Sequence, residues 1–209
     1  MVKLVTGTNK DRFATLLDGM FRDRKRVFVD RLKWDVPVVD GIYERDEYDT
    51  DESVYLISPD PKTGAHMGSM RYLKTTGPHL LKDVFPNLVE GELPIGEDVW
   101  EITRLCTSPD VKGEDARNVR RHLSIAMIEF AILYGASRLT MMTHMDYLSH
   151  LLAVGWECRP LGMPHEYAGQ MLGAMEISIT PATLRTVRTL FGGGAQVPVL
   201  ELEGVNKAA

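Results

Sequence analysis

The stretches DVWEITRLC (98–106) and RLTMMTHM (138–145) decide the fold, because each is a mostly apolar run of strand length. Between them, residues 117–134 place their apolar side chains on one helical stripe, which predicts a helix. Gly135 follows this helix as a stop signal. The chain therefore contains a strand–helix–strand unit, and such units build α/β folds.

The sequence on both sides extends this unit. Upstream, apolar residues at helical spacing predict a helix at 11–29, and the turn sequence PDPKTG joins two predicted strands at 53–58 and 66–74. Downstream we expect a helix at 146–154, a strand near 174–179 and a last helix, in which Thr180 is the N-cap and Pro181 the first residue. This order predicts a three-layer α/β/α sandwich with one mixed sheet.

One domain is expected at 1–191, followed by a glycine-rich connector and tail at 192–209. The run Gly192-Gly193-Gly194 lacks the Gly-Lys-Ser/Thr ending of a phosphate-binding loop, so it is predicted to be a helix stop and connector. The sequence VPVLELEG (197–204) then suggests a late edge strand before the tail.

Composition excludes several classes of protein. Among the 209 residues, 29 Asp and Glu outweigh 24 Lys and Arg, and this acidic balance argues against nucleic acid as the main partner. No apolar run is long enough to span a membrane, and the start MVKLVTGTNKDRF lacks the layout of a signal peptide, so a cytoplasmic protein is expected. Cys106 and Cys158 lie far apart in apolar surroundings and predict no disulfide.

Charged residues interrupt the apolar elements. Arg24 lies on the apolar stripe of the first predicted helix, where it is either paired inside the protein or extends from the edge of the stripe to water. Arg71, Glu101 and Arg104 interrupt predicted strands, either as a structural Arg–Glu pair or as part of a functional site. Glu101 and Arg104 are an odd number of residues apart, so a shared pocket requires the strand to bulge or splay near 102–103.

An acidic loop with aromatic residues occupies 41–51 (GIYERDEYDTD), and Trp34 lies shortly before it. Such a loop is often just a solvated surface, but carboxylates interleaved with aromatic rings suit a cationic small molecule. Calcium is a competing ligand, although the spacing does not match an EF-hand loop. The six histidines form no ligand spacing with the cysteines, and no metal is expected.

These residues, in this order, resemble the acyl-homoserine-lactone synthase (autoinducer synthase) family. The resemblance covers about residues 12–190 and includes the stretches RVFVDRLKWDVP, ERDEYDTD, MRYLKTTGPHLLKDVFP and VWEITRLCTSP. The positions that match the pattern of the family are Arg24, Phe28, Trp34, Asp46, Asp49, Arg71, Phe85-Pro86, Glu101 and Arg104. No single motif is decisive, but the ordered set is specific.

The resemblance implies a fold like that of the Gcn5-related N-acetyltransferases and an acyltransferase reaction on two substrates. An acyl thioester acylates the α-amino group of S-adenosylmethionine, whose carboxylate then attacks its own γ-carbon and expels methylthioadenosine. No cofactor beyond these substrates is expected. Asp46 and Asp49 are expected to hold the cationic end of S-adenosylmethionine, Phe28 and Trp34 to wall it, and Phe85 to belong to the same binding set. Arg24, Arg71 and Arg104 either hold the acidic loop in place or neutralise the substrate carboxylate, and Glu101 is the expected proton acceptor, directly or through a water.

The acyl donor is predicted from one stretch in which this chain departs from the pattern of the family. Members that use acyl carrier protein carry basic residues on the helix before a Gly-Trp, whereas here His150 is the only possible cation before Gly155-Trp156. This departure favours an acyl-CoA donor over acylated carrier protein. Arg117, Arg120 and Arg121 are expected in the first turn of helix 117–134, where they either meet donor phosphates or are merely solvated.

The acyl pocket is expected to include apolar residues that also suit an ordinary core: Met127, Met142, Met145, Leu148 and Leu152. Thr143 matches the position where the family often places Thr when the acyl chain carries a 3-oxo group. Two other functions stay open: a Gcn5-like N-acyltransferase acting on another amine, and a non-catalytic module that binds an acyl ligand.

Overall fold

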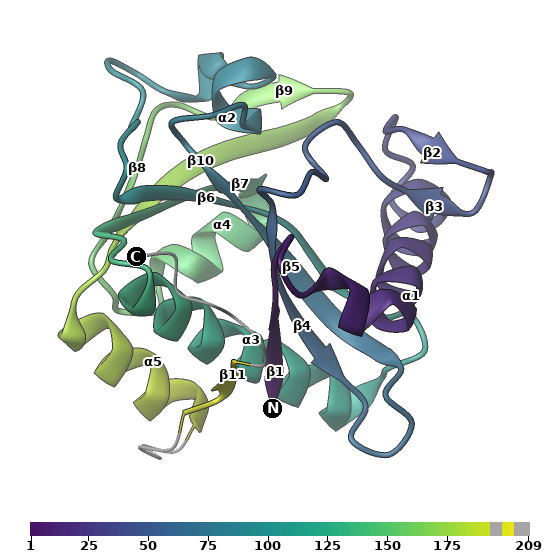
Figure 1. Cartoon of the computed structure of the whole chain (residues 1–209). Helices are drawn as coiled ribbons and strands as arrows, with labels where there is room; N and C mark the ends of the chain where they lie inside the picture. The colour runs from purple at the N-terminus through teal and green to yellow at the C-terminus, as the bar shows by residue number, and fades with distance from the viewer. Residues whose placement is uncertain (193–197, 203–209) are drawn as a thin grey trace. The chain divides into compact units, whose positions relative to one another are not determined.

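The structure is a computed structural model that describes residues 1–192 and 198–202 (Figure 1). Its strands are β1 (Val2–Val5), β2 (Val38–Val39), β3 (Tyr43–Glu44), β4 (Val54–Pro59), β5 (His66–Lys74), β6 (Val99–Thr107), β7 (Arg138–His144), β8 (Cys158–Pro160), β9 (His165–Tyr167), β10 (Gln170–Ser178) and β11 (Leu200–Glu201). Its α-helices are α1 (Ala14–Arg24), α2 (Leu80–Asp83), α3 (Gly113–Leu133), α4 (Met145–Leu152) and α5 (Pro181–Gly192). Short 3₁₀ turns occupy Lys10–Phe13 and Pro86–Leu88, and a π-helical segment occupies Lys25–Arg31.

The chain divides into two compact units. Among the described residues, the first comprises Met1–Arg71, Arg104–Met127 and 198–202, and the second comprises Tyr72–Thr103 and 128–192. β5, β6 and α3 each contribute residues to both units.

Strands of the first unit form a mixed sheet between two helices. β1 pairs in parallel with β11 and antiparallel with β4, and β4 neighbours β5. Residues of α1 pack on Val5, Tyr55 and Ile57, which share one face of the sheet. A Cβ added at Gly68 would lie 2.5 Å from Val119 of α3, so this glycine lets α3 approach β5 closely. Gly68 and Arg71 point to opposite faces of β5, which leaves the face of Arg71 available to the loop after β3.

The second unit places helices on both faces of its strands. β6 pairs in parallel with β7, and β10 pairs antiparallel with β7, β8 and β9. Leu81 of α2 packs in a cluster with Ala174 of β10. The neighbouring Gly173 meets Leu148 and Met145 of α4, so α2 and α4 lie against opposite faces of β10. The predicted α/β sandwich with a mixed sheet is confirmed.

Helix and strand boundaries follow the predictions unevenly. β5 matches the predicted strand 66–74, and the first helix extends to Arg31 through its π-helical segment. α3 begins at Gly113 rather than 117, because Glu114 and Asp115 form a first turn that precedes the apolar stripe. β10 begins at Gln170 instead of 174, and the short elements β1, β2, β3, α2, β8 and β9 were not predicted.

Two predicted helix signals are confirmed in detail. Gly135 adopts φ +69°, and the N–H of Ala136 donates to the carbonyl of Ala131 over 2.8 Å, as in a Schellman cap. At the start of α5, Thr180 Oγ1 accepts from the N–H of Thr183 over 3.2 Å, and Pro181 is the first helical residue. The predicted late edge strand is β11, whereas the rest of the predicted connector and tail (193–197 and 203–209) lies outside the described residues.

Neither cysteine forms a disulfide, as predicted. Burial raises the pKa of Cys106 to about 12, so its thiol stays protonated at neutral pH. Within residues 1–192 and 198–202, no helix combines the length and apolar character needed to cross a membrane.

Candidate functional site

A π-helical segment shapes the aromatic side of the site. After Arg24 the chain continues as a wider helix to Arg31, and such insertions often occur at functional sites. The N–H of Trp34 donates to the carbonyl of Phe28 over 2.9 Å, which turns the chain back on itself. The two rings stack with centroids 4.8 Å apart and planes 12° from parallel. The structure therefore brings together the two aromatic residues that the sequence predicted as walls of one pocket.

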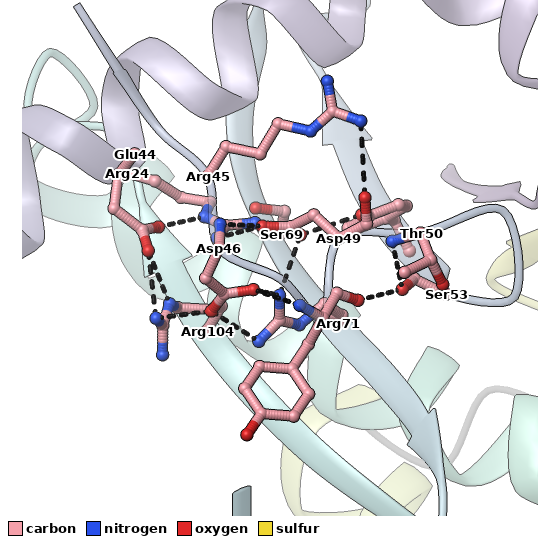
Figure 2. A network of polar contacts seen from close by, with 12 residues as sticks. Arg24, Glu44, Arg45, Asp46, Asp49, Thr50, Ser53, Ser69, Arg71 and Arg104 are labelled. Carbon is pink, nitrogen blue, oxygen red and sulfur yellow. Dashed lines mark hydrogen bonds and ion pairs between the residues drawn. The ribbon is translucent and has the colours of Figure 1, made fainter. Parts of the chain in front are cut away.

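Three arginines and three carboxylates of the first unit form a closed ring (Figure 2). Arg24 donates to both oxygens of Asp49 over 2.9 Å each and from Nε to Glu44 over 2.5 Å. Arg104 bonds Glu44 over 3.0 Å and Asp46 over 2.7 Å. Arg71 bonds Asp46 over 2.5 and 3.1 Å and pairs with Asp49 over 2.9 Å, which closes the ring. Each charge thus contacts two opposite charges.

The ring is buried, and its charges depend on one another. The six side chains are at most 8% exposed, so water screens these pairs little. Burial alone would raise the pKa of Asp49, but the charges of Arg24 and Arg71 outweigh it and lower that pKa. Burial alone would lower the pKa of Arg24, but Asp49 and Glu44 raise it. Arg24 is therefore paired inside the protein rather than extended to water.

A left-handed backbone conformation places the Arg104 side chain in the ring. Arg104 adopts φ +52°, a left-handed conformation that is unfavourable for a residue with a side chain. This residue breaks the alternation of β6, so its guanidinium reaches Glu44 and Asp46 and lies 5.6 Å from the Phe28 ring centroid. The predicted irregularity of the strand is confirmed, one residue beyond the predicted position. The contacts of Glu44 and Asp46 hold the strained residue in place.

Glu44 is the ring residue that sequence reasoning missed. It is fully buried, whereas its neighbours Arg45 and Glu47 are exposed. In a run of four charges, composition alone does not show which side chain points inward. The sequence offered Glu101 as the third carboxylate beside Asp46 and Asp49, whereas the structure pairs Arg24 and Arg104 with Glu44. Tyr43-Glu44 also forms β3, which pairs with Val38–Val39.

Glu101 lies in the second unit, fully buried on β6. Its two oxygens accept hydrogen bonds from the backbone N–H groups of Leu80 and Leu81, over 2.9 and 2.7 Å. These N–H groups belong to the first turn of α2, which has no intrahelical acceptor for them. Glu101 therefore anchors the start of α2.

Within the second unit, the residues predicted for the acyl side lie on both faces of β7. Met142 pairs with Ala174 and packs with Phe85 on the α2 face, whereas Thr143 pairs with Gly173 on the α4 face. Phe85 also meets Tyr167 edge to face, at 5.0 Å between centroids. Met145 and Leu148 lie against Gly173, while Leu152 is 36% exposed. Met127 is buried on α3 in the first unit. Met142 and Thr143 therefore lie on opposite faces of β7, and the acyl pocket stays a prediction.

The three basic residues that were predicted in the first turn of a helix lie beyond that turn. Arg117, Arg120 and Arg121 are exposed on α3, but they follow the first turn of this helix. Glu114 and Asp115 occupy that turn, where the positive end of the helix dipole already meets carboxylates. The helix terminus therefore does not add to these arginines as a phosphate site. Across the described residues, no three side chains of His, Cys, Asp or Glu gather as a candidate metal site.

The α/β sandwich with its mixed sheet is a fold like that of the Gcn5-related N-acetyltransferases. The fold matches the structure of an acyl-CoA N-acyltransferase from Pseudomonas aeruginosa with a TM-score of 0.56, at 13% identity over 85% of this chain and 99% of the other. The sequence profile described as autoinducer synthase matches residues 8–183. The chain belongs to the autoinducer synthase family, and its enzyme class is that of the acyl-homoserine-lactone synthases.

Individual relatives agree with this assignment. An acyl-homoserine-lactone synthase of Ralstonia solanacearum is 32% identical over 183 residues, which cover 85% of this chain and 89% of the relative. The structure of BjaI, a CoA-dependent acyl-homoserine lactone synthase with SAM and isopentyl-CoA, superposes with a TM-score of 0.87. That similarity has 25% identity and covers 99% of this chain and 94% of BjaI. A second structure of BjaI contains MTA.

Proposed function

We propose that this chain makes an acyl-homoserine lactone from S-adenosylmethionine and an acyl-CoA. In the first step the α-amino nitrogen forms an amide bond with the acyl carbon as the thioester C–S bond breaks. The amine proton leaves and the CoA thiolate departs. In the second step the methionine carboxylate displaces methylthioadenosine from the γ-carbon and closes the lactone. The two substrates balance this reaction without a cofactor.

The observation that carries the proposal is the closed ring of charges beside the Phe28–Trp34 stack. Every carboxylate of the ring is already held by two arginines. The main contribution of the ring is therefore to fix the conformation of the acidic loop. The aromatic faces then suit the sulfonium through cation–π contact. Arg104 is the most exposed of the three ring arginines, and its planar guanidinium matches the geometry of a substrate carboxylate.

Glu101 remains the proposed proton acceptor. An ammonium group is not a nucleophile, so acylation needs a base near the amine. The backbone N–H groups of Leu80 and Leu81 bond one oxygen each and hold this carboxylate in one orientation.

Two observations favour acyl-CoA as the donor. The BjaI structure is described as CoA-dependent and contains isopentyl-CoA, and its fold covers nearly the whole of this chain. The helix α4, where carrier-dependent members are basic, carries only His150 as a possible cation. An acidic carrier protein therefore meets little complementary charge on this helix.

The purified chain, supplied with S-adenosylmethionine and a series of acyl-CoAs, tests this function. We expect equal release of free CoA thiol, methylthioadenosine and acyl-homoserine lactone, measured by mass spectrometry. Turnover that appears only with acylated carrier protein contradicts the donor assignment. When a test amine is added, formation of its amide with release of CoA thiol and without consumption of S-adenosylmethionine indicates an N-acyltransferase acting on another amine. Binding of acyl ligands without any turnover indicates a non-catalytic module.

Gly173 offers a test of the acyl side. A Cβ at this position would lie 2.6 Å from Leu148 and 2.9 Å from Met145, so Gly173→Ala forces both side chains to move. Overpacking of this kind costs about 1–3 kcal/mol of stability. If the α4 face holds the acyl chain, we expect kcat/KM for long acyl-CoAs to fall about 10-fold more than for short ones. The matched control is Gly77→Ala, because the nearest atom to its added Cβ is the carbonyl oxygen of Lys74 at 3.8 Å, an ordinary contact, and its backbone is outside the left-handed region. An equal loss for all chain lengths contradicts this location.

A further inference from the structure

Arg45 contacts the acidic loop from outside the ring. Its side chain is exposed, unlike that of the adjacent Glu44. Figure 2 shows its guanidinium turned away from the ring and bonded to Asp49. The donated hydrogen bond runs from Nη2 to the backbone carbonyl of Asp49 over 3.3 Å. Arg45 thus holds the backbone of the residue whose carboxylate belongs to the ring.

Phe21 of α1 connects Arg45 to the ring. The guanidinium carbon of Arg45 lies 5.6 Å from the centroid of the aromatic ring of Phe21, and the guanidinium carbon of Arg24 lies 5.1 Å from the same centroid. Tyr55 meets Phe21 edge to face at 6.2 Å and donates its hydroxyl to Asp49 over 2.8 Å. One aromatic side chain therefore contacts a buried arginine, an exposed arginine and a third group that bonds Asp49.

The exposed position of Arg45 decides where the loop opens most easily. The ring residues are buried and each is held by two partners, so their contacts break only together. Arg45 and Phe21 line an open hollow of about 370 Å³ on the first unit, which water reaches. Local opening begins where contacts are few and exposed, which here is the Arg45 side of the loop.

We propose that Arg45 and Phe21 are positioning residues for S-adenosylmethionine, which clamp the 44–49 loop against α1 and so keep it in the binding conformation. This inference rests on the proposed function of the loop. The apparent affinity for a ligand falls in proportion to the fraction of molecules in the competent conformation. Arg45 therefore acts on KM for S-adenosylmethionine through Asp49 and leaves the acylation chemistry unchanged.

The test compares Arg45→Met with Arg22→Met. Both arginines are exposed, and each guanidinium lies over one aromatic ring, but Arg22 bonds Asp18 and Tyr43 instead of Asp49. We expect Arg45→Met to raise KM for S-adenosylmethionine about 5-fold, as the loss of one exposed cation–π contact and one hydrogen bond would give. Its kcat, its KM for acyl-CoA and its melting temperature (within about 2 °C) stay unchanged. Arg22→Met changes none of these quantities.

Two further variants separate the contacts. Arg45→Lys keeps a cation over Phe21 but loses the planar guanidinium. Its KM for S-adenosylmethionine should therefore rise only about half as much as that of Arg45→Met. Phe21→Leu removes the platform of Arg45, so adding Arg45→Met to it should raise KM about 2-fold or less. A full 5-fold effect of Arg45→Met in the Phe21→Leu background overturns the role of Phe21.

Hydrogen–deuterium exchange of residues 44–52 gives a readout that does not need turnover. We expect faster exchange in Arg45→Met than in the parent chain or in Arg22→Met. If the parent chain makes lactone while Arg45→Met changes neither exchange nor KM, the clamp is wrong and the proposed function stands. If the parent chain makes no lactone but the exchange increases, the clamp exists and the proposed function fails.

Discussion

We expect Asp49→Asn to lower the free energy of unfolding by about 3–5 kcal/mol, the usual cost of removing one partner from a buried ion pair. The carboxylate of Asp49 accepts from five donors: two nitrogens of Arg24, Nη1 of Arg71, the N–H of Asp46 and the hydroxyl of Tyr55. An asparagine keeps one acceptor oxygen and turns an NH₂ group toward donors. Arg24 and Arg71 would each lose an opposite charge in a buried site.

Urea titration followed by circular dichroism measures this loss, and Asp51→Asn is the matched control. Asp51 belongs to the same acidic stretch, but its side chain is 77% exposed and its ion pair with Lys10 lies at the surface. Such exposed pairs contribute about 1 kcal/mol or less. We also expect Asp49→Asn to lose turnover at temperatures where it is still folded, because the loop is no longer fixed. Equal stability of the two variants would show that the ring does not stabilise the first unit.

The difference in unfolding free energy between the parent chain and Asp49→Asn should depend on pH with a definite sign. The folded-state pKa of Asp49 is lowered, so ionised Asp49 stabilises the fold at neutral pH. This contribution is fully present above the unfolded pKa of about 4 and is lost as the pH falls through the lower folded pKa. The difference in unfolding free energy between the parent chain and Asp49→Asn should therefore be constant near pH 7 and shrink below about pH 4. A difference that grows on acidification contradicts the pairing.

The sequence predicted the long elements because their patterns extend over many residues. The stripe of α3 and the apolar runs of β5 and β6 each repeat a period often enough to exclude other structures. Short elements such as β2 and β9 contain two or three residues, too few to show any period. Tertiary contacts rather than local preference form them, as for β9, whose described pairing is with β10.

The site shows the same limit at the level of single residues. Arg24, Arg71 and Arg104 stood out because a charge in an apolar pattern requires an explanation. Glu44 did not stand out, because its neighbours are equally polar and only the fold turns it inward. The ring joins side chains from four separate segments, and side-chain pairing between segments leaves no periodic trace in any one of them. The left-handed backbone at Arg104 follows from this pairing, so the sequence located it only to within a residue.

The largest expected loss of rate comes from Glu101→Gln. A general base contributes about 10²–10⁴-fold, so we expect kcat for acylation to fall at least about 100-fold in this variant. The structure adds a second effect: Gln has one acceptor oxygen, whereas Glu101 serves two N–H groups of α2. One of these N–H groups would face an NH₂, so stability should also fall by about 1–3 kcal/mol.

Chemical rescue separates the base from the anchor. Glu101→Ala removes the base and leaves space, so formate or acetate added to this variant should restore part of the acylation rate in proportion to its concentration. Glu101→Gln fills the same space with an amide and should not respond, which makes it the matched control. If Glu101 only anchors α2, both variants lose rate in proportion to their lost folded fraction, and added carboxylate changes nothing. Full activity of Glu101→Gln would instead require another group to take the proton from the amine, and the base assignment would be wrong.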